Sequence, residues 1–180
     1  MSPLLKNILR IIFYGIVFFI IDHFLESANA IRQIQFSYSY PFMVFISVVF
    51  GPYVGGFGIV LGLLLKQIGE HTSDILYIFS SFLNCFSIGY YMRYLDIQNG
   101  FFERSDMAKF NMYQLASNFV CWNLIYAVLS HFIYHTNLWE VLQKGFWQAL
   151  GNFLSNLVAA SIFLALYARS RVSAANFYRN

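Results

Sequence analysis

Charged side chains are scarce in this sequence. Its 180 residues include 11 Lys and Arg and 8 Asp and Glu, which is 11% of the chain, whereas a soluble domain carries about 25%. The hydrophobic share is 59%, and the charges gather in short stretches between long apolar runs. This composition excludes a water-soluble fold and is typical of a polytopic membrane protein.

Several functional signatures are also missing. The two cysteines, Cys85 and Cys121, lie inside apolar runs, so neither a disulfide framework nor a four-thiolate metal site is expected. The sequence contains no P-loop and no Gly-x-Gly-x-x-Gly motif, and it lacks both a Gly-x-Ser-x-Gly elbow and paired catalytic carboxylates within a span. We therefore expect no ATP hydrolysis in this chain, no cofactor or catalytic residue of its own, and no nucleic-acid partner.

The apolar runs predict an all-α membrane protein with a single domain over residues 1–180. A spanning helix needs roughly 20 residues, and six spans are expected, the second of them short. The first run is retained as a helix because it ends at Asp22 and His23 without a small-residue cleavage site, and Gly51-Pro52 breaks the second run from the third. The predicted spans are about 5–25, 36–50, 53–65, 75–92, 110–134 and 146–167.

The Lys and Arg residues predict the orientation of these spans. If both termini are cytoplasmic, eight basic residues lie inside, namely Lys6, Arg10, Arg93, Arg104, Lys109, Arg169, Arg171 and Arg179. Three lie outside, namely Arg32, Lys66 and Lys144. Because cytoplasmic loops carry the excess of Lys and Arg, we expect a multi-pass protein of the bacterial cytoplasmic membrane with both termini inside.

Uncharged amides recur at helical spacing within the later spans. The fifth span carries Asn111, Gln114, Asn118 and Trp122 on one face, the sixth carries Gln148, Asn152, Ser155 and Asn156, and the fourth has a looser cluster of Ser80, Ser81, Asn84 and Ser87. Such amides either hold helices together, at about 0.6 kcal/mol per interaction, or bind a neutral polar ring, because an amide both donates and accepts. Both interpretations stay open.

The second interpretation predicts a pocket that opens outward. The amide-bearing fifth and sixth spans are joined by one short outer loop, so their outer halves converge with that of the fourth, and aromatic side chains supply flat walls. Outer loops with Arg32, Gln33, Lys66, Gln67 and residues 135–144 would cover it. The candidate substrate-binding residues are Asn84, Asn118, Trp122, Tyr126, Gln148, Asn152, Arg32 and Lys66.

Two further patterns are weaker indications of function. His131 and His135 have the spacing of a helical metal site, but the intervening residues lack the Glu of a zinc protease motif and a third ligand is not obvious, so an interfacial or pocket-lining role is favoured and no metal is expected. Small residues at four-residue steps allow helices to approach closely. The glycines at such steps are Gly51, Gly55, Gly58 and Gly62, and with Gly15 of the first span they are taken as candidate partner contacts.

The order of these motifs resembles the substrate-binding S components of energy-coupling factor (ECF) transporters, in particular the riboflavin-type and hydroxymethylpyrimidine-type group. The segment from Tyr40-Pro41-Phe42 to Phe50-Gly51-Pro52-Tyr53-Val54-Gly55-Gly56 is similar to the hairpin of that group's second and third helices. The fifth span and the stretches Gln143-Lys144-Gly145-Phe146 and Ala165-Leu166-Tyr167-Ala168-Arg169 look like its last two helices. The first span lacks the Ala-x-x-x-Ala face that such proteins use against their coupling subunit, and offers Gly15.

The resemblance implies a six-helix bundle that captures a vitamin or vitamin precursor outside. Release inside would need a transmembrane coupling subunit and two ATPase subunits, which use ATP and Mg²⁺. The candidate ligands are hydroxymethylpyrimidine, a flavin and a cobalamin-like corrinoid. Two alternatives from other classes are a structural membrane protein of the cell-shape-factor type, which needs no ligand pocket, and a small membrane enzyme.

Overall fold

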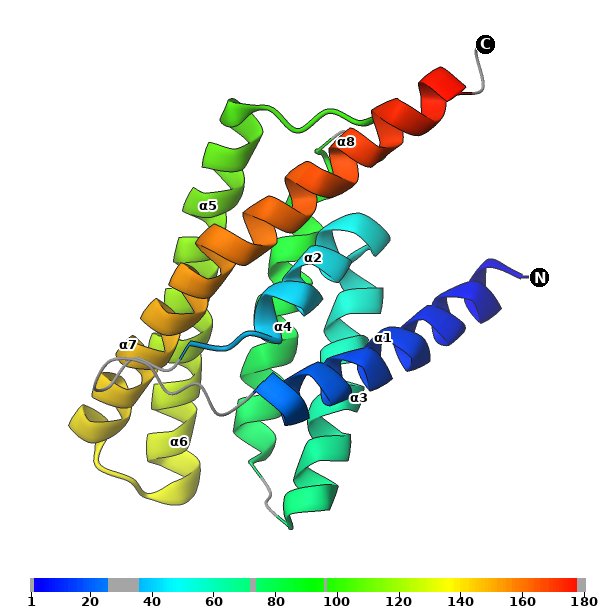
Figure 1. Ribbon diagram of the computed structural model, residues 1–180. Helices are drawn as coiled ribbons and strands as arrows, with labels where there is room; N and C mark the ends of the chain where they lie inside the picture. The colour runs from blue at the N-terminus through cyan, green and yellow to red at the C-terminus, as the bar shows by residue number, and fades with distance from the viewer. Residues whose placement is uncertain (1, 26–35, 72–73, 96, 178–180) are drawn as a thin grey trace.

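The computed structural model describes residues 2–25, 36–71, 74–95 and 97–177, with side chains as far as Val172. Most of these residues are helical, and they contain no strand. The first four α-helices are α1 (Pro3–Leu25), α2 (Tyr40–Phe50), α3 (Pro52–Glu70) and α4 (Ile75–Met92), followed by the short 3₁₀-helix η1 (Ile97–Asn99). Figure 1 shows their arrangement.

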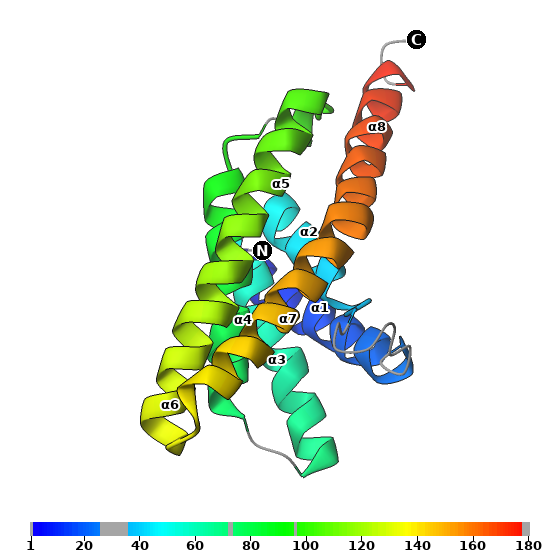
Figure 2. The same cartoon turned by 90° about the vertical axis from the view of Figure 1, so that its left-hand side faces the viewer.

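The rest of the chain forms two long continuous helices, each interrupted by a π-helical segment. The fifth consists of α5 (Arg104–Asn118), η2 (Phe119–Tyr126) and α6 (Ala127–Tyr134). The sixth consists of α7 (Leu138–Ser155), η3 (Asn156–Ala160) and α8 (Ser161–Phe177). The two are adjacent at the α6–α7 turn and diverge toward their other ends (Figure 2).

Five of the helices in the described part of the chain are long and apolar enough to cross a membrane. The exception is α2, whose 11 residues extend about 16 Å, short of the roughly 30 Å of a hydrocarbon core. It begins at Tyr40, four residues later than predicted, and its residues Met43, Val44 and Ile46 are buried in the core. The all-helical fold is confirmed, with α2 as a short helix inside the bundle.

Glycines set the close approach of α1 and α2 to α3. A Cβ on Gly55 would lie 2.6 Å from Ser47 Cα of α2, and one on Gly58 would lie 2.6 Å from Met43 Cε. Where α1 crosses α3 (Figure 1), a Cβ on Gly15 would lie 3.0 Å from Gly58 O, and one on Gly62 would lie 2.9 Å from Gly15 O. At four of the five glycines considered as partner contacts, the space that a Cβ would need is therefore filled by other residues of the chain.

The fifth glycine, Gly51, has a different role. It lies in the α2–α3 turn with φ at 100°, and a Cβ there would meet nothing within 4 Å. This positive φ favours glycine because it lacks a Cβ, and Pro52 begins α3 directly afterwards. Gly51 and Pro52 together make the tight turn that the sequence predicts.

Candidate functional site

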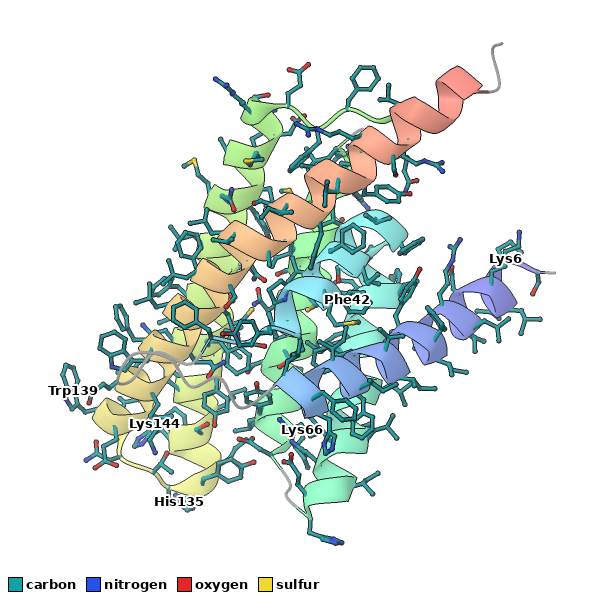
Figure 3. All side chains as sticks on the ribbon, viewed as in Figure 1. Lys6, Phe42, Lys66, His135, Trp139 and Lys144 are labelled. Carbon is teal, nitrogen blue, oxygen red and sulfur yellow. The ribbon has the colours of Figure 1, made fainter. Side chains whose placement is uncertain are left out.

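A cavity of about 570 Å³ lies between α4, η2 and α7. That volume is within the range of small-molecule sites, about 300 to 1,000 Å³. Nine residues line it, namely Tyr77, Trp122, Tyr126, Glu140, Gln143, Lys144, Gly145, Trp147 and Gln148. Figure 3 shows Lys144, Trp139 and His135 together near the α6–α7 turn, which is the same end of the molecule as the α3–α4 turn.

The walls of the cavity are aromatic. The ring of Trp122, which is 1% exposed, lies 4.9 Å from the ring of Tyr77 and 5.8 Å from that of Tyr126, measured between centroids. Tyr40 of α2 packs behind it at 6.3 Å. Gly145 allows α7 to approach η2 closely, since a Cβ there would lie 3.1 Å from Asn123 Cα.

Polar side chains of α7 lie next to these rings. Gln148 Nε2 donates to Asn152 Oδ1 at 3.3 Å, one helical turn deeper. Asn152 is fully buried and its Nδ2 has no hydrogen-bond partner within the described protein. Glu140 and Lys144 are exposed and lie nearer the α6–α7 turn. The site thus combines flat apolar walls with a few polar groups, which suits a planar organic ligand.

Asn84 and Asn118 are paired with each other and do not line the cavity. Asn84 Nδ2 donates to Asn118 Oδ1 at 2.7 Å and to the Tyr40 hydroxyl at 3.1 Å, and Ser117 Oγ donates to Asn84 Oδ1 at 2.6 Å. Asn118 Nδ2 donates to Gln114 O at 2.7 Å. Both amides are fully buried, and their bonds join α2, α4 and α5 in the middle of the bundle.

Lys66 takes part in an ion pair beside the cavity and not in its lining. Its Nζ lies 2.9 Å from Asp22 Oδ2 at the end of α1, and Asp22 also accepts from Ser39 Oγ. On the neighbouring side, the Tyr126 hydroxyl donates to Asp74 Oδ2 at 3.0 Å, and the Gln67 side chain bonds the Asp74 backbone. These contacts tie α1, α3 and α4 to the cavity wall. Arg32 and Gln33 lie outside the described residues.

Comparison with known proteins assigns the family. Residues 5–169 match the family model described as "ECF-type riboflavin transporter, S component". The chain belongs to this family. S components are membrane subunits that bind a transport substrate and are not enzymes, so the alternatives of a cell-shape factor and a membrane enzyme are set aside.

Relatives of this S component match nearly its whole length. A UPF0397 protein of Enterococcus faecalis is 30% identical over 171 residues, covering 92% of this chain and 91% of the relative. UPF0397 proteins of Staphylococcus aureus (28% identity, covering 93% and 91%) and Lacticaseibacillus casei (30%, covering 86% and 84%) are also similar. No solved structure matches. The protein is a multi-pass membrane protein of this family.

The two histidines of the S component occupy different local structures. His131 Nδ1 hydrogen-bonds with Thr136 O at 2.7 Å. His135 follows the last residue of α6 with a left-handed φ of 52°, so the two imidazoles do not share one helical face. No group of three or more potential metal ligands is found among the described residues.

Sequence reasoning identified Trp122, Tyr126 and Gln148 of the cavity lining but missed Tyr77, Gly145 and Trp147. It expected Glu140, Gln143 and Lys144 in a covering outer loop, whereas they lie on α7. Trp147 belongs to a stripe on α7 at steps of three and four residues, running from Glu140 through Gln143 and Lys144 to Trp147 and Gln148. The sequence shows this periodicity. It was not recognised as a helix face because the predicted sixth span began at residue 146, whereas the helix begins at Leu138.

Proposed function

We propose that this S component captures a vitamin or vitamin precursor from the outer side of the membrane, in the cavity between α4, η2 and α7. The observation that carries the proposal is the cavity itself, whose aromatic walls and neighbouring amides fit a flat polar molecule. Hydroxymethylpyrimidine, a flavin and a corrinoid remain the candidate ligands. The binding residues proposed from the structure are Trp122, Tyr126 and Gln148, with Asn152 beneath them.

The proposed orientation puts the cavity outside and both termini in the cytoplasm. The turns that lead to the cavity, α3–α4 and α6–α7, lie at one end of the molecule, and the start of α5 and the end of α8 lie at the other (Figure 1). That second end carries Arg104, Lys109, Arg169 and Arg171, in agreement with the positive-inside rule. The proposed location of the protein is therefore the bacterial cytoplasmic membrane.

Delivery inward requires partners, because the sequence has no nucleotide-binding motif. We propose a transmembrane coupling subunit and two ATPase subunits that use ATP and Mg²⁺. Since Gly15, Gly55, Gly58 and Gly62 are occupied by contacts inside the chain, the coupling subunit would meet exposed faces of α1 to α3 near Gly51 and not these glycines.

Reconstitution tests this function. The S component is placed in proteoliposomes with and without an ECF module, and uptake of radiolabelled riboflavin, hydroxymethylpyrimidine and cobalamin is measured. We expect ATP-dependent accumulation of one of them with the module and saturable binding without accumulation in its absence. Concentrative uptake by this chain alone would refute the proposal, as would the absence of binding to all three.

A further inference from the structure

A second, smaller cavity lies between α4 and the fifth helix, and it shares no lining residue with the first. Its volume is about 270 Å³, below the range of about 300 to 1,000 Å³ for small-molecule sites. Ala116 and Val120 form an exposed rim, so this cavity is a groove that opens to the surrounding lipid. We call it the α4–α5 groove. Its lining residues are Leu83, Ser87, Tyr113, Ala116, Ser117, Val120, Cys121 and Ile125.

The α4–α5 groove is apolar in its interior. Its two serine hydroxyls are bonded within the protein, because Ser117 Oγ donates to Asn84 Oδ1 at 2.6 Å and Ser87 Oγ donates to Asn84 O at 3.0 Å. Apart from Tyr113, the other lining side chains are apolar. A polar occupant would lose its hydrogen bonds to water without replacement, whereas a hydrocarbon chain has none to lose.

Tyrosines mark the end of the groove that lies at the membrane surface. The rings of Tyr91 and Tyr113 lie 4.3 Å apart between centroids, and Tyr90 and Tyr94 beside them are exposed. Tyrosine is enriched at the interface between membrane and water. Ser87 precedes Tyr94 by seven residues, about 10 Å along a helix, so the groove lies below the headgroups, at the depth of the acyl chains.

Arg93 is held at this surface end by two rings. Its Cζ lies 4.1 Å from the ring centroid of Tyr90 and 4.7 Å from that of Tyr94. At 100° per residue, both tyrosines share the face of α4 that carries the groove residues Leu83 and Ser87. Within the described part of the chain, no acid forms an ion pair with Arg93. The guanidinium is therefore fixed above the groove with its charge uncompensated by a described carboxylate.

A second basic side chain flanks the same end from α5. Lys109 precedes Tyr113 by one helical turn, so it lies on the face of α5 that carries Tyr113 and Ser117. Its side chain is 68% exposed, and its Nζ lies 3.6 Å from Asp106. An ammonium group has three donors, so this exposed contact with Asp106 leaves donors for an anion at the membrane surface.

We propose that the α4–α5 groove binds an anionic phospholipid, with one acyl chain in the groove and the phosphate on Arg93 and Lys109. The apolar interior fits the chain, and the basic side chains at the surface end fit a headgroup with net negative charge, such as phosphatidylglycerol. Basic pockets between spanning helices bind anionic headgroups in this way. The proposal concerns a surface separate from the first cavity and does not depend on which vitamin that cavity binds.

Native mass spectrometry of the full chain tests this lipid site. The protein is released from detergent micelles that contain equal amounts of phosphatidylglycerol and phosphatidylcholine with identical acyl chains, and the known lipid masses identify what stays bound. We expect one phosphatidylglycerol per chain, favoured over phosphatidylcholine by about fivefold or more, because each Arg or Lys near a membrane surface contributes about that factor. Excess glycerol phosphate, the headgroup without chains, should not displace it.

Matched variants separate the two parts of the site. Ala116→Phe and Val120→Phe fill the groove from its exposed rim and should each lower phosphatidylglycerol occupancy about tenfold, as when 1.4 kcal/mol of binding free energy is lost. Met112→Phe, at an exposed position outside the lining, should not. Arg93→Gln should lower occupancy about fivefold. Arg104→Gln, on the opposite face of α5 from Tyr113, should leave it unchanged.

Several results would overturn the proposal. Equal retention of the two lipids by the wild type, or retention of neither, would show that no anionic lipid is selected. Equal occupancy in Ala116→Phe, Val120→Phe and Met112→Phe would place the acyl chain elsewhere, and equal effects of Arg93→Gln and Arg104→Gln would leave only general charge attraction. A dimer that Ala116→Phe dissociates would show that a second copy of the chain covers the groove.

Discussion

The buried amides of this protein divide into two roles that their residue types do not distinguish. Asn84 and Asn118 bond to each other and to neighbouring helices, whereas Gln148 lines the cavity and is bonded to Asn152. Helical spacing correctly puts such residues on one face. It does not say whether that face meets another amide or a cavity, because this depends on which residue lies opposite in the folded bundle.

The role of joining helices leads to a prediction for Asn118. Replacing Asn118 with Ala removes the acceptor of Asn84 Nδ2 and should destabilise the protein by about 1 to 3 kcal/mol, seen as a lower melting temperature in detergent. Ligand affinity of the folded fraction should change less than about threefold. Met112→Ala, at an exposed position of the same helix, is the control. A large loss of affinity without a loss of stability would move Asn118 into the ligand site.

At the scale of helices, the sequence predicted the number of elements better than their ends. The sixth helix begins eight residues before the predicted span because Asn137 Oδ1 caps it by accepting from Trp139 N at 2.9 Å. The fifth begins at Arg104 because Glu103 and Asp106 form a capping box. A hydropathy profile cannot locate such helix ends, because the terminal turns of a helix at the membrane surface carry charged side chains, as a loop does.

The sequence pattern also could not predict the π-helical segments. A stripe drawn at a uniform 100° per residue assumes i→i+4 bonds, but η2 has i→i+5 bonds over Phe119–Tyr126, so Trp122 and Tyr126 are rotated from the face occupied by Asn111 and Gln114. Deviations of this kind are frequent at functional sites. We interpret η2 as the element that aims Trp122 and Tyr126 toward α7.

A deletion tests this interpretation. Leu124 lies within η2 and is 54% exposed, so removing it should convert the segment to an α-helix and rotate Trp122 relative to Tyr126 without opening the core. We expect circular dichroism to show unchanged helix content and ligand binding to fall at least tenfold. Leu124→Ala is the matched control and should bind normally. Unchanged affinity in the deletion variant would show that the π-helical geometry is dispensable.

The crossing of α1 over α3 depends on Gly62, where an added Cβ would meet Gly15 O at 2.9 Å. Gly62→Leu should overpack this crossing, and substitutions of this kind cost about 1 to 3 kcal/mol or more, so we expect a clearly lower melting temperature. Gly69→Ala is the control, because a Cβ there meets nothing within 4 Å. Equal melting temperatures for the two variants would show that α1 does not pack tightly on α3.

For the molecule as a whole, composition was enough to predict an all-helical membrane protein, because 11% charge cannot cover a soluble surface. Motif order was enough to suggest the S component family, which the family model confirms over residues 5–169. The exact cavity was not predictable. It is formed by side chains of α4, η2 and α7, which only the folded bundle brings together, and such tertiary geometry leaves no local pattern in the sequence.

The orientation is a property of the whole chain and can be tested by labelling. The native thiols, Cys85 and Cys121, are buried, so a membrane-impermeant maleimide should report introduced cysteines alone. We expect Glu140→Cys to react in intact cells and Arg171→Cys to react after permeabilisation, because positive charge favours the cytoplasmic side. Labelling of Arg171→Cys in intact cells would mean that the bundle is inverted.

The central claim is that a small molecule binds in the cavity between α4, η2 and α7, and native mass spectrometry of protein purified from cells grown in rich medium tests it most directly. The wild type should carry one small molecule per chain. Gln148→Trp, which fills the cavity, should lose it, and Leu166→Trp, at an exposed position of α8, should keep it. Retention of the same molecule at equal occupancy by Gln148→Trp, or an empty wild-type protein, would contradict the account.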